Sequence, residues 1–304
     1  MRRDARRGLA ATPKSLPPRW LYDDVGSELF ERITQVPEYY PTRREKAILD
    51  TYAADIAAVS EADTLVELGA GTSEKTTVLL DALAARGSLR RFAPFDVAEA
   101  TLSETAQRMV ARYRGLAVEA VVGDFTEHLD HLPRGGRRLI VFLGGTIGNL
   151  GPTERSSLLT TVASGMRPGD TFLVGTDLVK DRTRLIQAYD DAEGVTAAFN
   201  KNVLAVLNRR LGAAFRAELF DHVAYYDDDE HRIEMRLRAR TAQRVPVAGL
   251  GLEVQFEAGE YLLTEISTKF TEAQIGAELT AAGMTVVRTY TDPAADFAVS
   301  LAAV

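Results

Sequence analysis

The sequence contains no cysteine in its 304 residues, which excludes disulfides, thiolate nucleophiles and cysteine metal sites. Histidine is also scarce, and its four copies fit no zinc-motif spacing, so we expect no metal: His128, His131, His222 and His231. No apolar run approaches the ~20 residues of a membrane span. The segment Met1–Arg7 is basic but lacks the apolar core of a signal peptide. We therefore expect a cytoplasmic protein with no membrane partner.

Positive charge is in deficit, because 36 lysines and arginines face 43 aspartates and glutamates, for a net charge of −7. This balance argues against nucleic acid as the partner. The content of 46% hydrophobic and 26% charged residues is that of an ordinary globular protein. A length of 304 residues suggests two domains with cores that need no disulfide. We expect a monomer that acts on a small molecule.

Residues 63–77 carry the clearest ligand-binding pattern of the chain, but they lack the third glycine of a dinucleotide-binding motif. The stretch predicts a short strand, a sharp turn at Gly69-Ala70-Gly71, and a helix capped by Thr72 and Ser73. This arrangement binds nucleotide-like ligands at the carboxyl end of a parallel sheet. Glu74 stands where a dinucleotide motif has its third glycine, and an acid fits poorly beside a pyrophosphate. The motif therefore favours S-adenosylmethionine (SAM), which has no phosphate; a tight turn without a ligand is the alternative.

A repeated strand–helix pattern follows, with strands expected at residues 91–97, 117–125, 138–143 and 171–176. Asp96, 27 residues after Gly69, has the spacing of an acid that binds ribose hydroxyls, although it would equally cap the next helix. Asp124 ends its strand where SAM enzymes commonly place an acid for the adenine amino group. Residues 144–150, with three glycines and Asn149, lie directly beyond a buried strand, where ligands bind.

The segment 180–269 lacks the strand–helix repeat. Its sequence predicts helices, followed by strands in which apolar and polar residues alternate. One strand carries Glu265 and Ser267 on the same face. Residues 1–17 look poorly fixed. The loop Pro37–Thr42 is held rigid by two prolines, and its tyrosine pair is either a lid or substrate wall or simply packed under a turn.

These patterns predict an α/β fold with a Rossmann-like, seven-stranded SAM-dependent methyltransferase domain that ends in an antiparallel hairpin. We expect this domain at residues 44–179 and 270–304. A second, α+β substrate-binding domain is expected at residues 1–43 and 180–269.

Several long motifs occur in one order along the chain: Leu16–Trp20, Pro37–Thr42, Val66–Thr76, Thr146–Leu150, Gly175–Asp181, Ala188–Asp191, Phe199–Leu204 and Thr264–Ser267. Through them the chain resembles, over nearly its whole length, the L-histidine Nα-methyltransferases of ergothioneine biosynthesis. The resemblance implies that three methyl groups pass from SAM to the α-amine of histidine, which gives hercynine. Three positions depart from the expected pattern: Ala70 and Gly145 replace serines, and Thr268 replaces a cysteine.

The resemblance also implies two sets of site residues. SAM would be bound by Tyr22, Gly69, Lys75, Asp96, Asp124 and Phe125, the last packing on the adenine ring. Histidine would be bound by Phe30, Tyr39, Gly144, Asn149, Tyr189, Met235, Glu265, Ile266 and Ser267. Within this second set, Asn149 and Tyr189 would fix the amino-acid head, while Glu265 and Ser267 would read the imidazole. Tyr39 is the candidate catalytic residue, with water as the alternative acceptor of the amine proton.

The chemistry agrees with this resemblance, because methyl transfer from a sulfonium to a neutral amine needs positioning and neither a metal nor a covalent enzyme intermediate. Three alternatives stay open. The first is a SAM-dependent methyltransferase of another amino acid or amine, and the second is a SAM-binding protein without catalysis. The third is a nicotinamide-dependent dehydrogenase, which Glu74 disfavours.

Overall fold

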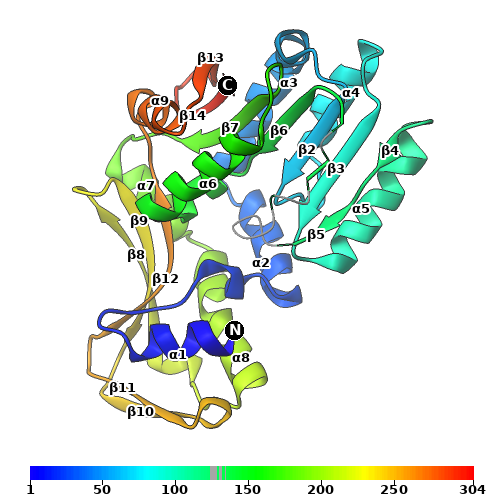
Figure 1. Cartoon of the computed structure of the whole chain (residues 1–304). Coiled ribbons are helices and arrows are strands. Elements are labelled where there is room, and N and C mark those ends of the chain that lie inside the picture. The colour runs from blue at the N-terminus through cyan, green and yellow to red at the C-terminus, as the bar shows by residue number, and fades with distance from the viewer. Residues whose placement is uncertain (124–128, 130–131, 134) are drawn as a thin grey trace. The chain divides into compact units, whose positions relative to one another are not determined.

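The chain divides into two compact units. The computed structural model describes residues 1–123, 129, 132, 133 and 135–304 and is shown in Figure 1. Unit 1 comprises Met1–Tyr40 and Lys180–Lys269, and unit 2 comprises Pro41–Val179 and Phe270–Val304. The sequence places the first boundary after residue 43, whereas unit 2 begins at Pro41, where α3 (Pro41–Ser60) starts. A proline suits the first turn of a helix, because its missing N–H has no partner there in any case.

Unit 2 contains an eight-stranded sheet where the sequence predicts seven strands. Seven strands follow the order β13-β14-β7-β6-β2-β3-β4, and the eighth, β5, also pairs with β3. Its strands are β2 (Thr64–Leu68), β3 (Arg91–Asp96), β4 (Ala117–Val118), β5 (Val121–Val122), β6 (Arg138–Phe142), β7 (Thr171–Asp177), β13 (Thr285–Thr291) and β14 (Phe297–Ala303). The strands from β2 to β7 pair in parallel, and β14 runs antiparallel to both β7 and β13. The Rossmann-like class and the final hairpin are confirmed. The strand expected at 117–125 is instead two short pieces in the part that the structure describes.

Helices pack on both faces of this sheet because both faces carry apolar residues. Leu65 belongs to one buried cluster together with residues of α3 and α4, whereas its neighbour Val66 belongs to a second cluster with residues of α6 and α9. Successive side chains of a strand point to opposite faces, so continuous apolar runs require cover on both. The helices of unit 2 after α3 are α4 (Thr76–Ala85), α5 (Glu99–Arg112), α6 (Pro152–Gly165) and α9 (Glu272–Ala281), with a short helix η3 (Thr146–Asn149) after β6.

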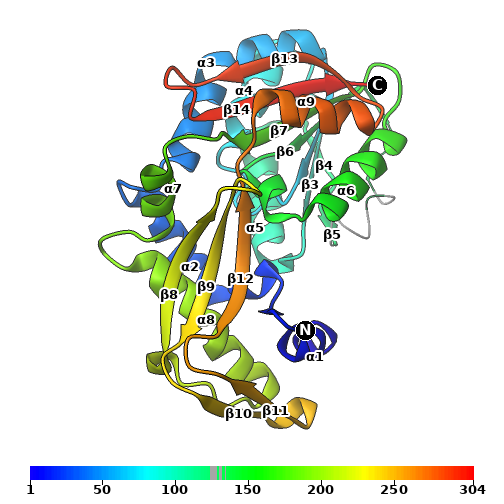
Figure 2. The ribbon, with the colours of Figure 1, turned by 90° about the vertical axis from the view of Figure 1, so that its left-hand side faces the viewer.

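Unit 1 is an α+β structure built on a four-stranded sheet of order β1-β12-β9-β8. Figure 2 shows β8, β9 and β12 running side by side. Its strands are β1 (Lys14–Ser15), β8 (Phe220–Asp227), β9 (Arg232–Ala239), β10 (Gln243–Val247), β11 (Leu252–Phe256) and β12 (Tyr261–Thr268), of which β10 and β11 form a separate hairpin. Its helices are α1 (Arg2–Ala10), η1 (Pro18–Leu21), α2 (Asp24–Gln35), α7 (Arg182–Tyr189), α8 (Val195–Leu211), η4 (Ala217–Leu219) and η5 (Ala248–Leu250). Among the described residues, no helix has the length and apolar character to cross a membrane.

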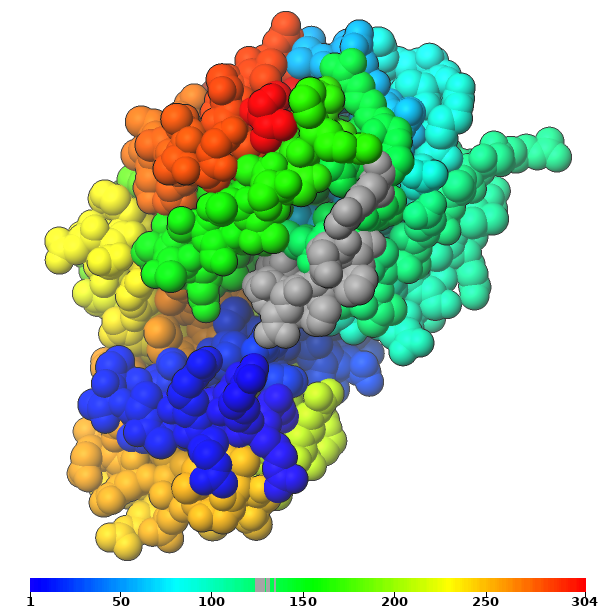
Figure 3. Space-filling model, viewed as in Figure 1, coloured from blue at the N-terminus to red at the C-terminus, as the bar shows by residue number. Residues whose placement is uncertain are grey.

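The N-terminal segment is not poorly fixed, and the sequence-based expectation for it is wrong. Residues Arg2–Ala10 form α1, in which Ala5 and Leu9 are buried in the core of unit 1. Asp4 accepts hydrogen bonds from Arg19 at 3.0 Å and from the Trp20 ring nitrogen at 3.2 Å. Figure 3 shows α1 at the surface beside the segment that carries β10 and β11. This segment forms a short amphipathic helix, and its many basic residues made the apolar face hard to recognise from composition alone.

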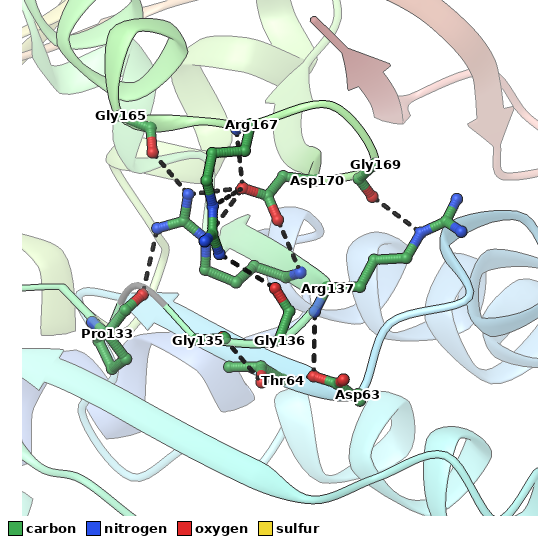
Figure 4. A network of polar contacts seen from close by, with 11 residues as sticks. Asp63, Thr64, Pro133, Gly135, Gly136, Arg137, Gly165, Arg167, Gly169 and Asp170 are labelled. Carbon is green, nitrogen blue, oxygen red and sulfur yellow. Dashed lines mark hydrogen bonds and ion pairs between the residues drawn. The ribbon is translucent and has the colours of Figure 1, made fainter.

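A buried ion pair fastens the start of β6 to the loop before β7 (Figure 4). The Arg138 guanidinium donates to Asp170 Oδ2 from two nitrogens, at 3.0 and 2.5 Å, and the Arg138 backbone N–H donates to Asp170 Oδ1 at 2.9 Å. Arg138 also donates to the carbonyls of Pro133 and Gly165. Burial by itself raises the pKa of Asp170, but these hydrogen bonds, with one from the Arg167 backbone, hold that pKa below its ordinary value.

We predict that Asp170→Asn lowers the free energy of unfolding of unit 2 by about 3 kcal/mol, because it leaves a buried guanidinium without its counter-charge. The folded pKa of Asp170 is depressed, so its contribution is complete above the unfolded value of ~3.9 and is lost as the pH falls through the folded value. The variant should lack this acid-dependent loss. Urea unfolding, followed by hydrogen exchange of β6 and β7 amides, measures both effects.

The matched control is Asp81→Asn, which removes a surface ion pair with Arg112 in the same unit. Both partners of that pair are about half exposed, so the expected cost is below about 1 kcal/mol. Equal costs for the two variants would contradict the assignment of Arg138 and Asp170 as a fold-defining pair.

Candidate functional site

The glycine turn after β2 is anchored to the end of β3. The backbone N–H groups of Gly69 and Ala70 donate to the Phe95 carbonyl at 2.8 and 3.0 Å. Gly71 has a φ of +48° and donates its N–H to Asp96 Oδ2 at 2.9 Å, while Asp96 Oδ1 accepts from the Ala98 N–H at 2.9 Å. Asp96 therefore shapes the turn and also meets the start of α5, where Ala98 is the cap residue. A β-carbon at Gly71 would meet nothing within 4 Å, so the turn presents an open face.

The loop between this turn and α4 is ordered by a buried acid that the sequence reading missed. Glu67 in β2 is only 5% exposed and accepts hydrogen bonds from Ser73 at 2.6 Å and from Thr76. Burial raises the pKa of Glu67 to about 7, against the opposing effect of these hydroxyls. The helix begins at Thr76 with Lys75 as its cap residue, so the prediction that Thr72 and Ser73 cap it is wrong. The hydroxyl of Ser73 binds Glu67 instead.

A second buried acid joins two predicted site residues. Glu45 in α3 is fully buried, and its carboxylate oxygens accept from the Gly144 N–H at 2.7 and 2.9 Å. The same carboxylate forms an ion pair with the Lys75 ammonium. A β-carbon at Gly175 would lie 2.1 Å from Glu45 Oε1, so only glycine fits there. The signal for Glu45 was its helical spacing with Ile48 and Leu49, which puts a carboxylate on the buried face.

Four predicted aromatic residues form one chain of edge-on contacts in unit 1. The ring of Phe30 lies 5.4 Å from that of Tyr22 and 6.1 Å from that of Tyr39, measured between centroids. Tyr39 in turn lies 6.0 Å from Tyr189. Phe199 of α8 packs against both Tyr22 and Phe30. Edge-to-face contacts of this kind fix ring orientation, so the four side chains are positioned as a group.

The neighbouring strands β9 and β12 bring Met235 and Glu265 opposite each other. Glu265 is 7% exposed, and its Oε2 atom is buried without a hydrogen-bond partner within the structure. Burial raises the pKa of Glu265 to about 7, while the positive charge of Lys269 acts to lower it. A buried acid without a partner carries a desolvation cost that an N–H donor from a ligand would offset. Glu265 is therefore a candidate for binding a donor group of a ligand.

Tyr189 is held at both of its ends. Its hydroxyl bonds to Ser267 Oγ at 2.8 Å, and its backbone carbonyl accepts from His222 Nε2 at 2.8 Å. Because a carbonyl only accepts, His222 carries its proton on Nε2, and its Nδ1 accepts from the Asn200 amide at 2.8 Å. The Asn200 oxygen accepts from Thr264 at 2.6 Å. Burial lowers the pKa of His222, which favours the neutral ring that this network requires.

The structure places the predicted site residues in both units. Unit 1 contains Tyr22, Phe30, Tyr39, Tyr189, Met235, Glu265, Ile266 and Ser267, and unit 2 contains Gly69, Lys75, Asp96, Gly144 and Asn149. Within unit 1 Tyr189 touches both Tyr39 and Ser267, whereas Ile266, which follows Glu265 on the strand, belongs to the opposite face. Asp124 and Phe125 lie outside the described residues. The hydroxyl pair of Tyr189 and Ser267 was not foreseen, because the sequence assigned the two residues to different ends of the ligand.

Comparison with known proteins identifies the family. The model of the family described as "Histidine-specific methyltransferase, SAM-dependent" matches residues 1–304. The chain is 60% identical to "Histidine N-alpha-methyltransferase" of Mycobacterium tuberculosis (strain CDC 1551 / Oshkosh), over 100% of this chain and 94% of that protein. It is 59% identical to "Histidine N-alpha-methyltransferase" of Mycolicibacterium smegmatis, over 99% of this chain and 94% of that protein.

A more distant relative is "Ergothioneine biosynthesis protein 1" of Schizosaccharomyces pombe, 31% identical over 93% of this chain and 38% of that protein. The match of the family model over the whole chain agrees with the glycine turn of unit 2 and with the buried acid of unit 1. The chain is therefore an enzyme that belongs to the family of histidine-specific, SAM-dependent methyltransferases.

Proposed function

We propose that the enzyme transfers methyl groups from SAM to the α-amine of L-histidine three times, and so produces hercynine for ergothioneine biosynthesis. The observation that carries the proposal is the buried Oε2 of Glu265, which has no partner within the structure and suits an imidazole N–H. An aliphatic or phenyl side chain would leave this carboxylate unpaired, which is the basis on which such a site rejects analogues.

Residues of unit 1 would bind the histidine side chain. Glu265 would accept from one ring N–H, and Ser267 would donate to the other ring nitrogen. Met235, opposite Glu265 in the sheet, and Phe30 would form apolar walls. Asn149 and Tyr189 would bind the amino-acid head, and Gly144 and Ile266 belong to the same proposed set of substrate-binding residues.

SAM would be bound chiefly by residues of unit 2. The open face of the turn at Gly69 and Gly71 would admit the ligand, and Asp96 would accept from its ribose hydroxyls. The Lys75 ammonium is a positive group that follows the turn, and it would suit the carboxylate of SAM. Tyr22 would contribute an aromatic wall, and we keep Asp124 and Phe125 as the proposed adenine contacts.

Methyl transfer breaks the bond between the sulfonium and its methyl group and forms a bond from that carbon to the amine nitrogen, which leaves S-adenosylhomocysteine. The amine must be neutral to attack, so the starting ammonium first loses a proton. Each of the first two transfers then gives a protonated amine that must lose a proton before the next transfer. The proton would pass to water, either directly or through the Tyr39 hydroxyl, which takes it up as it passes its own proton on. Tyr39 is 8% exposed and packed between Phe30 and Tyr189. Such packing orients the Tyr39 ring. Holding the amine and the methyl group of SAM in line would supply up to roughly 7–11 kcal/mol in favourable cases.

We also propose a monomer in the cytoplasm in which the two units are domains, one for SAM and one for the amino acid. A methyltransferase of another amino acid is the second candidate function, and it predicts the same fold with a different product.

Mass spectrometry of reactions with SAM and each common amino acid tests the proposal. We expect an increase of three methyl groups with L-histidine and none with the others. Methylation of a different amino acid would retain the family and overturn the substrate, and SAM binding without any methyl transfer would overturn the proposed reaction.

The variant Glu265→Gln should lower kcat/KM for histidine by about tenfold to a hundredfold, because a hydrogen bond to a charged group contributes about 1.5–3 kcal/mol. Its melting temperature should rise or stay unchanged, because the variant removes a buried acid. The control Glu257→Gln alters an exposed acid of the same unit and should leave kcat/KM unchanged. Steady-state kinetics that show equal effects for both variants would remove Glu265 from the histidine site.

The variant Glu45→Gln should raise the dissociation constant of S-adenosylhomocysteine by about tenfold, since it removes the charge that holds Lys75 and the Gly144 backbone. Isothermal titration calorimetry measures this effect. Asp50→Asn, at an exposed position of the same helix, is the control. A dissociation constant for the Glu45 variant that matches the control would show that Glu45 serves the fold alone.

A further inference from the structure

A buried lysine contacts the hydroxyl groups of both Tyr189 and Ser267 in unit 1. Lys269 follows β12 and is fully buried. Its ammonium donates to Ser267 Oγ at 2.8 Å and to the Tyr189 hydroxyl at 2.9 Å, and it lies 4.5 Å from the centroid of the Tyr189 ring. With the mutual bond of 2.8 Å between the hydroxyls, the three polar atoms form a closed triangle.

The hydrogen atoms of this triangle can be counted. An ammonium only donates, so both hydroxyl oxygens accept from Lys269 and neither can give it a hydrogen. The bond between Tyr189 and Ser267 uses one of the two hydroxyl hydrogens. The other hydrogen is not used within the triangle and points out of it. Lys269 thus converts two hydroxyls, each able to donate or accept, into a pair that presents a donor.

The strand places this donor beside the unpaired acid. Residues 265, 267 and 269 alternate along β12 and its continuation, so Glu265, Ser267 and Lys269 share one face. That face offers an acceptor at Glu265 and a donor at the hydroxyl pair. A neutral imidazole has the complementary set, one N–H and one nitrogen with a lone pair. A ring with two N–H groups, or with one N–H and no second nitrogen, satisfies only half of it.

We propose that Lys269 is a positioning residue that sets substrate selectivity, by holding the Tyr189–Ser267 pair so that the Ser267 hydroxyl directs its hydrogen to the bare ring nitrogen of histidine. The inference rests on the proposed function and extends it to a residue that does not itself touch the substrate. Its charge has a second effect in the same direction, because it opposes the burial that raises the pKa of Glu265 and so favours the carboxylate that accepts the N–H.

The test compares wild type, Lys269→Met and Lys269→Gln with two substrates, L-histidine and pyrrolylalanine, whose ring keeps one N–H but has no second nitrogen. Methionine has a similar length and cannot donate, whereas glutamine keeps an uncharged donor. Lys14→Met is the control, because it removes an ion pair with Glu260 at the other end of β12. Near-ultraviolet circular dichroism and SAM titration verify the folded state of each variant, and if Lys269→Met does not fold, Lys269→Gln carries the comparison.

For Lys269→Met we expect the KM for histidine to rise about tenfold to a hundredfold, with kcat changed by less than about threefold. The preference for histidine over pyrrolylalanine should fall by a similar factor. Lys269→Gln should recover part of both losses, and Lys14→Met should match wild type. Equal losses on both substrates, or an unchanged preference, would overturn the inference and leave Lys269 a packing residue. A wild type that methylates no histidine would overturn the proposed function itself.

Discussion

A carboxylate that is removed from water needs a hydrogen-bond donor, and this constraint organises both units. Glu45 receives the Gly144 N–H and the Lys75 ammonium, and Glu67 receives two hydroxyls of the loop before α4. Each of these acids ties a loop of unit 2 to a neighbouring element. Glu265 is buried to a similar degree, yet one of its oxygens has no partner within the structure. The protein itself supplies donors to Glu45 and Glu67, whereas in the proposed function the substrate supplies the donor to Glu265.

The side chains near Glu265 on the same strand face are held by a network of hydrogen bonds. The hydroxyl of Tyr189 is held by Ser267 and Lys269, and its backbone by His222, whose ring is fixed in turn by Asn200. Buried networks of this kind specify a single arrangement only when their members are satisfied. Here Tyr189, Ser267, His222 and Asn200 are hydrogen-bonded to one another or to Lys269, whereas Oε2 of Glu265 has no partner among the described residues. In the proposed function, selectivity for imidazole follows from this arrangement of donors and acceptors, and apolar walls set the size of the site.

Periodicity in the sequence was enough to predict most of the fold. The parallel strands of unit 2, the final hairpin and the shared face of Glu265 and Ser267 all follow from alternation and from glycine turns. The same rule, extended by two residues, would have found Lys269. Contacts between distant segments were not predictable in this way. Glu45 meets Gly144 across 99 residues, and α1 is held by core residues and carbonyls far along the chain. The cap residue before α4 was misassigned because Glu67 competes for the Ser73 hydroxyl.

Glu265 is proposed to accept a hydrogen bond from the imidazole N–H of histidine. The protonation state of the Glu265 carboxyl, with and without histidine, tests this proposal most directly. Infrared difference spectra of wild type against Glu265→Gln, recorded at pH 6 with S-adenosylhomocysteine present, isolate its band. Burial raises the pKa of Glu265 to about 7, so the free enzyme should show the protonated acid. Adding L-histidine should convert it to the carboxylate at the same pH, since a bound N–H donor favours the charged form. A carboxyl band that histidine leaves unchanged would contradict the account.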